Sequence, residues 1–148
     1  MKILLAYDGL PHSKHALEEA AELGARGRAE VVVFSVVPEA EARASKAGGH
    51  RVLPPHAHQD VAVAHGYLRE RGIPSEMKIE HGDPVEEIRK EAAAGAYDLI
   101  VVGSRGRGTV SSALLGSVSR KLVDDAPCPL VVAGKDASVR HEPASPVG

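Results

Sequence analysis

Short apolar runs that do not alternate with polar residues recur along this chain, and they limit its fold more than any other feature. The runs cover residues 3–7, 31–37, 99–102 and 130–133. Uninterrupted runs rich in β-branched residues are typical of strands buried on both faces of a parallel sheet. None of them approaches the roughly 18 to 20 apolar residues that a membrane helix needs. The sequence therefore predicts a parallel sheet at the centre of the molecule and no membrane span.

Segments with helical spacing separate these runs. Residues 13–27 and 60–71 each place small or apolar side chains three and four positions apart. A third helix is predicted from Asp83 to about residue 95, because an Asp N-cap is followed by Pro at the first helical position and Glu three residues after the cap. A fourth helix is expected to end before Pro127.

Residues 75–81 alternate between apolar and charged side chains, so we expect an edge strand that is half exposed to water. Strands and helices thus alternate, and right-handed crossovers convert that order into an open, doubly wound α/β sheet. We predict five parallel strands in the order 3-2-1-4-5, with helices on both faces. The last strand is then an edge with no charge before Lys135. Because an open apolar edge invites pairing, we expect a homodimer through Leu130, Val131 and Val132.

The length of 148 residues suits one domain of ordinary size. We assign this domain to residues 1–135. The connection 38–59 is much longer than usual and is expected to be a loop or a lid. Residues 136–148 have the composition of a flexible tail.

The charge balance excludes several classes of function. The 18 Lys and Arg residues against 20 Asp and Glu residues give a formal charge of −2, so no global basic field attracts nucleic acid or an acidic membrane. Four aromatic residues leave little surface for stacking single-stranded bases. The N-terminal apolar run is too short for a secretory signal, and a lone cysteine, Cys128, fits a reducing compartment. We expect a cytoplasmic protein that binds neither nucleic acid nor membrane.

The candidate chemistry lies at the ends of the first and fourth predicted strands, where an open sheet of this order binds its ligands. Asp8-Gly9 follows the first strand, the glycine-rich stretch 103–109 follows the fourth, and a helix begins near Gly116. Glycines let main-chain N–H groups approach phosphate oxygens, and a helix N-terminus adds a favourable dipole. The region 103–123 also has no acidic residue and four basic ones, Arg105, Arg107, Arg120 and Lys121. The arrangement predicts a phosphate cradle; the alternative is a tight turn that binds nothing.

Three familiar motifs do not fit this stretch. Its glycines have the Walker spacing, but Thr109 stands where a P-loop requires lysine. The dinucleotide fingerprint follows a first strand, whereas these glycines follow the fourth. A receiver domain needs an acceptor aspartate after the third strand, where this chain has Glu80 and His81.

The spacing Gly103-x2-Gly106-x9-Gly116-Ser117 does fit a known pattern. With the Asp8-Gly9 turn, Ser13 downstream of it and the ending at residues 126–132, this spacing makes residues 1–134 resemble the ATP-binding universal stress proteins. The resemblance implies a Rossmann-like fold that binds ATP, with Mg²⁺, across the carboxyl ends of the first and fourth strands.

The resemblance also implies a role for each matching residue. Ala6 and Asp8 would border the adenosine, and Val36 would touch the adenine. The phosphates would lie between two short segments, with Gly103, Ser104, Arg105 and Gly106 on one side and Gly116, Ser117, Val118 and Ser119 on the other.

Other candidate residues have a simpler interpretation. The histidines in or beside the long connection have no carboxylate or thiol at a diagnostic spacing, so we expect no metal site there; they are His50, His56, His58 and His65. Cys128 stands between two prolines before an apolar strand and is expected to be a small buried hydrophobe.

The leading interpretation is an ATP-binding regulatory module of the stress response. We assign no catalytic residue, because the sequence shows no general base that a second group would orient. One alternative is a slow ATPase or nucleotidyl-transfer enzyme, in which Asp8 holds a Mg²⁺-bound phosphate and Arg105 stabilises developing charge. Another is a dimeric scaffold that binds no nucleotide.

Overall fold

The structure is a computed structural model that describes residues 1–39, 46–47, 50–51, 55–103, 117–134 and 138–143. Of residues 46–47, 50–51, 55 and 117–119 it describes the backbone alone. In the described part of the chain, no helix is both long and apolar enough to cross a membrane.

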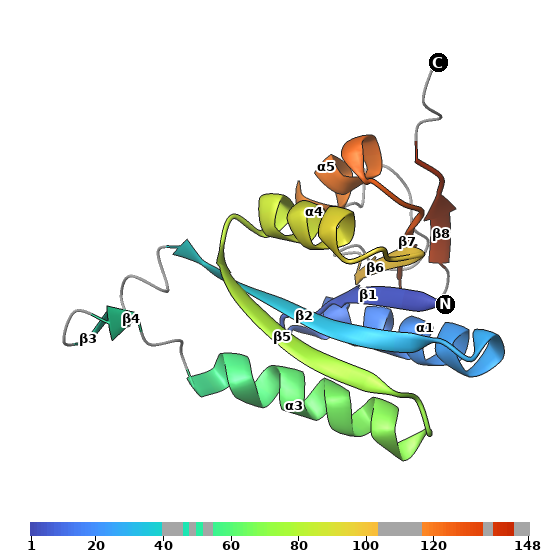
Figure 1. The fold of residues 1–148 in the computed structure, drawn as a ribbon, viewed down its shortest axis with the longest axis horizontal. Helices are drawn as coiled ribbons and strands as arrows, with labels where there is room; N and C mark the ends of the chain where they lie inside the picture. The colour runs from blue at the N-terminus through green and yellow to red at the C-terminus, as the bar shows by residue number, and fades with distance from the viewer. Residues whose placement is uncertain (40–45, 48–49, 52–54, 104–116, 135–137, 144–148) are drawn as a thin grey trace.

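A six-stranded sheet in the order β5-β2-β1-β6-β7-β8 forms the centre of the molecule (Figure 1). Five strands run parallel to their neighbours: β1 (Lys2–Ala6), β2 (Glu30–Pro38), β5 (Ser75–Gly82), β6 (Leu99–Gly103) and β7 (Leu130–Ala133). Their order confirms the predicted 3-2-1-4-5 arrangement. The prediction of a five-stranded, wholly parallel sheet is wrong, because β8 (Ser138–His141) adds a sixth strand antiparallel to β7.

The helices cover both faces of the sheet, as predicted. On one face lie α1 (Pro11–Gly27) and α3 (Pro55–Glu70), and on the other lie α4 (Pro84–Ala94) and α5 (Ser117–Asp125). Neighbouring residues of a strand point to opposite faces, so Ile3 and Leu5 pack with α1 and α3 whereas Leu4 packs with α4 and α5. This two-sided burial explains why the strands are continuously apolar in sequence.

The connection after β2 is shorter than expected, because α3 begins at Pro55 rather than near residue 60. Proline fits the first turn of a helix, since its missing N–H has no intrahelical acceptor there. Within the connection, two-residue strands β3 (Lys46–Ala47) and β4 (His50–Arg51) pair antiparallel. The rest of the predicted loop or lid, residues 40–45, 48–49 and 52–54, lies outside the described residues.

Four residues of the predicted flexible tail form β8, and this strand covers the outer edge of β7 (Figure 1). The predicted homodimer requires β7 to be an open edge. That premise does not hold here, because β8 pairs along the whole of β7, including Leu130, Val131 and Val132.

Glu91 ties α4 to the sheet. The Lys78 ammonium on β5 lies 2.7 Å from one Glu91 carboxylate oxygen, and the Tyr97 hydroxyl donates a hydrogen bond of 2.7 Å to the other. Burial by itself raises the pKa of Glu91, but the hydrogen bonds from Lys78 and Tyr97 outweigh it and hold the pKa below its usual range. The two bonds help to fix the position of α4 against β5.

The start of α4 confirms the predicted cap. The Asp83 side chain accepts a hydrogen bond of 3.0 Å from the Glu86 N–H, and Pro84 occupies the first helical position. Because three residues of this helix are buried on the sheet, Val85, Ile88 and Ala92, the cap fixes where they enter the core.

We expect Asp83→Ala to lower the free energy of unfolding by about 1 kcal/mol, because the substitution leaves a helix N–H without its acceptor. Urea unfolding followed by circular dichroism would measure the change. Asp83→Asn keeps a side-chain acceptor and should stay close to wild type. An equal loss in both variants would contradict a capping role for the side chain.

Candidate functional site

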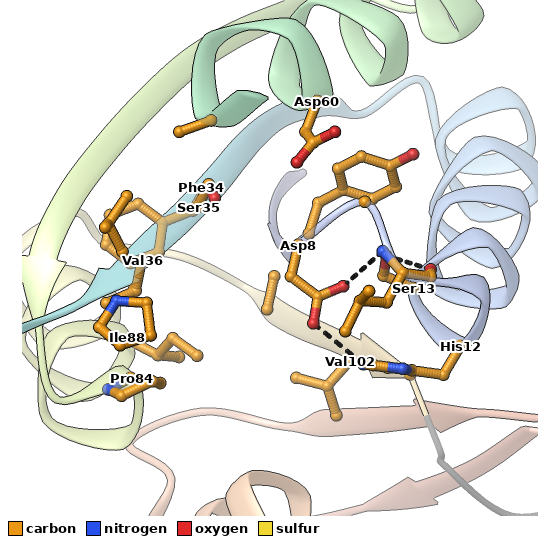
Figure 2. Close-up of a pocket in the computed structure, with 18 of the residues that line it drawn as sticks. Asp8, His12, Ser13, Phe34, Ser35, Val36, Asp60, Pro84, Ile88 and Val102 are labelled. Atoms are coloured by element: carbon orange, nitrogen blue, oxygen red, sulfur yellow. Dashed lines mark hydrogen bonds and ion pairs between the residues drawn. The ribbon is translucent and has the colours of Figure 1, made fainter. Parts of the chain in front are cut away.

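A cavity of about 520 Å³ opens at the carboxyl ends of β1, β2 and β6 (Figure 2). Segments far apart in the sequence line it: the turn after β1, the end of β2, the first turns of α3 and α4, and the end of β6. Its volume lies within the range of small-molecule sites in proteins. Its position is the one predicted from strand order, where the chain direction reverses between β1 and β6.

One side of the cavity is apolar. Figure 2 shows Val36 from β2 near Pro84 and Ile88 from α4, with Val102 of β6 to their right. Val36 is half-buried, and Ile88 and Val102 are buried in the core between the sheet and α4. The two faces of a purine base are apolar. Packing a base on this side of the cavity would therefore remove apolar surface from water and favour binding.

The opposite side carries Asp8, which is held by two contacts (Figure 2). One carboxylate oxygen accepts a hydrogen bond of 2.9 Å from the Leu10 N–H, and the other lies 3.1 Å from His12 Nε2. Burial by itself raises the pKa of Asp8, but the hydrogen bonds from His12 and the Leu10 N–H outweigh it and lower the pKa to about 2. The Asp8 carboxylate is therefore ionised at neutral pH and fixed in orientation.

A second carboxylate reaches the same side from α3. Asp60 lies directly against Gly9, where an added Cβ would approach the Asp60 carboxyl carbon to 2.5 Å. Gly9 also has a φ of 79°, in the left-handed region that glycine adopts without strain. The positive φ favours glycine, and any side chain at residue 9 would also force the Asp60 carboxylate to move.

The charges of Asp60 and Asp8 also act on Tyr7, which lines the same cavity. Burial raises the pKa of Tyr7, and the negative charges of Asp60 and Asp8 raise it further. Asp60 in turn lies 3.5 Å from His56 Nδ1, one turn earlier in α3. The polar side thus contains two Asp–His pairs, Asp8 with His12 and Asp60 with His56.

The structure brings four of the predicted ligand residues to this cavity: Ala6, Asp8, Val36 and Gly103. Ser104, Arg105, Gly106 and Gly116 lie outside the described residues. Ser117, Val118 and Ser119 form the first turn of α5, of which the backbone alone is described. Contact of any of these residues with a ligand remains a prediction.

Gly103 has a packing role that the sequence did not reveal. An added Cβ would meet the main-chain carbonyl oxygen of His12 at 2.2 Å, so α1 and the end of β6 approach each other too closely for any side chain. This contact explains the first glycine of the stretch without invoking a phosphate.

Sequence reasoning missed the contributions of the first turns of α3 and α4. His56 and Ala57 line the cavity because α3 begins earlier than expected, and Pro55 was the signal available for that start. Asp60 stands at the predicted start of this helix, but nothing in the sequence connected it with the site. Pro84 and Ile88 line it from α4, whose start was correctly predicted but not connected with the site.

One of the histidines beside the long connection has a packing role. His65 Nδ1 lies 2.6 Å from the Ser75 hydroxyl of β5, so this histidine belongs to the packing of α3 on the sheet. Among the side chains that the structure describes, no three His, Cys, Asp or Glu residues gather as metal ligands would.

Cys128 is free and buried, and burial raises the pKa of its thiol, as befits a small apolar core residue.

Comparison with known proteins places the same architecture in a family. Residues 1–134 match the Universal stress protein family. A Thermus aquaticus protein named "Universal stress protein in QAH/OAS sulfhydrylase 3'region" is 36% identical over 132 residues, which cover 88% of this chain and 96% of that protein. The solved structure of hypothetical protein MJ0577 is 25% identical, covers 92% of this chain and 96% of its own, and superposes with a TM-score of 0.76.

Three more distant solved structures share the fold and hold adenine nucleotides. A universal stress protein of Arabidopsis thaliana with AMP bound is 21% identical, with 93% of each chain covered and a TM-score of 0.69. A universal stress protein in complex with cAMP is 19% identical (90% and 96% covered, TM-score 0.71). The Archaeoglobus fulgidus protein in complex with dAMP is 23% identical (90% and 97% covered, TM-score 0.69).

We expect Gly103→Ala to lower the free energy of unfolding by about 1–3 kcal/mol, because the new methyl group must displace the backbone of α1. Gly66→Ala is the matched control. A Cβ at this position of α3 meets nothing within 4 Å, and alanine in a helix interior should add about 0.5–1 kcal/mol. Urea unfolding of both variants would test the packing role, and equal stability of the Gly103→Ala variant and wild type would contradict it.

We expect acid to remove the stabilising contribution of Asp8 as the pH falls from about 4 towards 2. Its pKa is about 2 in the folded chain against an ordinary value of 3.8, so the unfolded chain binds the proton first. The free energy of unfolding of Asp8→Asn should therefore fall less steeply over this window than that of wild type. Asp124→Asn, an exposed position on α5, should keep the wild-type slope; identical slopes in all three proteins would contradict the expectation.

Proposed function

The chain belongs to the universal stress protein family, and we propose that its cavity binds an adenine nucleotide, foremost ATP, as part of a regulatory module. The observation that carries the proposal is the pairing of an ionised, oriented Asp8 carboxylate with an apolar side of Val36, Pro84 and Ile88 in one cavity. A nucleoside has the matching halves, a flat apolar base and a sugar with hydroxyl donors.

In this proposal the base lies against Val36 and Ile88, and the sugar hydroxyls face the two carboxylates. Asp8 accepts one hydrogen bond, as the family resemblance implies. Asp60 offers a second acceptor, because its carboxylate lies against Gly9 on the same side of the cavity. Charged acceptors make hydrogen bonds about twice as strong as neutral ones.

The choice of adenine is supported by the ligands of the fold neighbours, which are AMP, cAMP and dAMP. The choice of a triphosphate rests on the spacing of Gly103, Gly106 and Gly116 and on the basic residues around them. Main-chain N–H groups of such a stretch, together with the first turn of α5, would hold the phosphates.

We place Mg²⁺ on the phosphates rather than on Asp8. Both Asp8 oxygens already have a donor, the Leu10 N–H on one and His12 on the other. A cation at this carboxylate would compete with His12 for the same oxygen, whereas a sugar hydroxyl can use the second lone pair of an oxygen that already accepts one hydrogen bond. This favours a hydrogen-bonding role for Asp8 over the metal-holding role of the enzyme alternative.

Slow ATP hydrolysis is the second candidate, and the Asp8–His12 pair favours it. A histidine oriented by a carboxylate is the usual form of a general base, and sequence reasoning had found no such pair. In the regulatory module, by contrast, bound ATP would persist and alter the surface around the cavity.

The single free Cys128 agrees with the proposed cytoplasmic setting of either activity.

The thermal midpoint of nucleotide-stripped protein, with and without Mg-ATP, tests the proposal. At about 100 times Kd, binding adds about 2.7 kcal/mol and should raise the midpoint by several degrees. Asp8→Asn should weaken binding about tenfold and Asp60→Asn severalfold, because each loses a charged acceptor. Asp124→Asn, outside the cavity, should bind as wild type does.

GTP serves as the ligand control, and phosphate release is measured in the same samples. A rise with ATP and AMP but not with GTP supports an adenine site. No rise with any nucleotide, or an equal rise with GTP, would overturn the proposal. Turnover near 1 per second that is lost in His12→Gln would favour the enzyme over the regulatory module.

A further inference from the structure

The polar side of the cavity carries negative charge, although every nucleotide is an anion. Asp8 and Asp60 both line the cavity, and the described residues around it include no Lys or Arg. In Figure 2 the two aspartates lie to the right of Val36, Pro84 and Ile88. This side therefore favours a part of a nucleotide that carries no phosphate.

Asp60 packs against the turn that contains Asp8. A Cβ on Gly9 would lie between 2.5 and 2.7 Å from each of the three atoms of the Asp60 carboxyl group. Asp8 directly precedes Gly9 in the chain, and the Leu10 N–H and His12 hold its carboxylate. The two carboxylates thus occupy neighbouring positions on the same wall.

The effect on Tyr7 shows that the two charges act at one place. Burial raises the pKa of its hydroxyl, and the negative charges of Asp60 and Asp8 raise it further, Asp60 more than Asp8. His56 lies 3.5 Å from Asp60, but more than half of its side chain is exposed, so water screens that contact. At about pH 8, histidine side chains are ordinarily neutral and leave both aspartate charges in place.

Free sugar hydroxyls suit this wall, and a sugar phosphate does not. Each hydroxyl donates one hydrogen bond, and a carboxylate oxygen that already accepts one bond has a second lone pair for it. A phosphate ester at the 2' or 3' position instead carries nearly two negative charges at neutral pH. Beside Asp8 and Asp60 it would bring like charges together in a partly enclosed cavity, which is strongly unfavourable.

We propose that Asp60, together with Asp8, restricts the cavity to nucleotides whose 2' and 3' hydroxyls carry no phosphate. The inference rests on the proposed function, because the sugar must lie against these carboxylates. Rejection of a wrong ligand by like charge is a common source of specificity. The same repulsion sets the direction of binding, with the phosphates turned away from Asp60 and towards Gly103 at the end of β6.

Three isomers test the proposal, since they contain the same atoms and differ only in where the second phosphate is attached. They are ADP, adenosine 3',5'-bisphosphate and adenosine 2',5'-bisphosphate. Isothermal titration calorimetry of nucleotide-stripped protein, at about pH 8 and with EDTA in every sample, measures the three dissociation constants. We expect wild type to bind ADP about tenfold or more tightly than either bisphosphate, because only the bisphosphates place charge against the two aspartates.

Asp60→Asn should move the affinities in opposite directions. ADP should bind severalfold more weakly, because a charged acceptor is lost, whereas both bisphosphates should bind more tightly, because a repulsive charge is removed. A merely structural role for Asp60 would weaken all three ligands together. Asp124→Asn is the matched control, since it removes the same charge from an exposed position on α5 outside the cavity, and it should keep the wild-type preference.

The ligands separate failure of this inference from failure of the proposed function. If ADP and both isomers fail to bind wild type, the proposed function is overturned, and this inference with it. If ADP binds but the bisphosphates bind equally well, or if Asp60→Asn keeps the wild-type preference, this inference alone is overturned.

Wild-type protein provides a second measurement if the Asp60→Asn variant fails to fold. Raising the salt from about 0.05 to about 0.5 M screens charge repulsion, so the preference of wild type for ADP over the bisphosphates should shrink severalfold. A preference that does not change with salt would mean that the bisphosphates are excluded by their size, and would overturn the role of the carboxylate charges.

Discussion

The approach of α1 to the end of β6 is the contact on which the rest of the site depends. The His12 carbonyl lies where any side chain on Gly103 would have to go, so the first turn of α1 sits directly against the last residue of β6. That position fixes the turn between β1 and α1, and with it Asp8. The same helix turn supplies His12, which holds the Asp8 carboxylate. One backbone contact thus sets both the shape of the cavity and the orientation of its best-defined charge.

A second close approach completes the wall. Gly9 lets α3 bring Asp60 to the turn after β1, although the two segments are far apart in the chain. Gly9 and Gly103 are therefore both explained by close contacts within the protein, without a ligand. Two carboxylates on one side of a cavity repel each other, and each has a histidine partner, His12 for Asp8 and His56 for Asp60.

The parts that sequence predicted correctly are those that local pattern determines. Continuous apolar runs predicted four of the parallel strands, the alternating run 75–81 predicted the fifth, and the Asp83 cap predicted the start of α4. Strand order placed Asp8 at the edge where the cavity opens, and the family resemblance added Ala6 and Val36, which also line it. The parts that were missed depend on contacts distant in sequence. Asp60 joins the site because α3 packs against the turn after β1, and β8, a short half-polar segment, forms a strand by pairing with β7.

The cavity lies where the two helical layers meet around the end of the sheet. Elsewhere among the described residues the strands separate them: α3 packs in the core with α1, and α4 packs in the core with α5. At the cavity, however, Asp60 of α3 and Ile88 of α4 line the same space. A molecule bound in the cavity would contact both layers. A displacement of α3 on one side of the sheet would then be transmitted through that molecule to α4 on the other side.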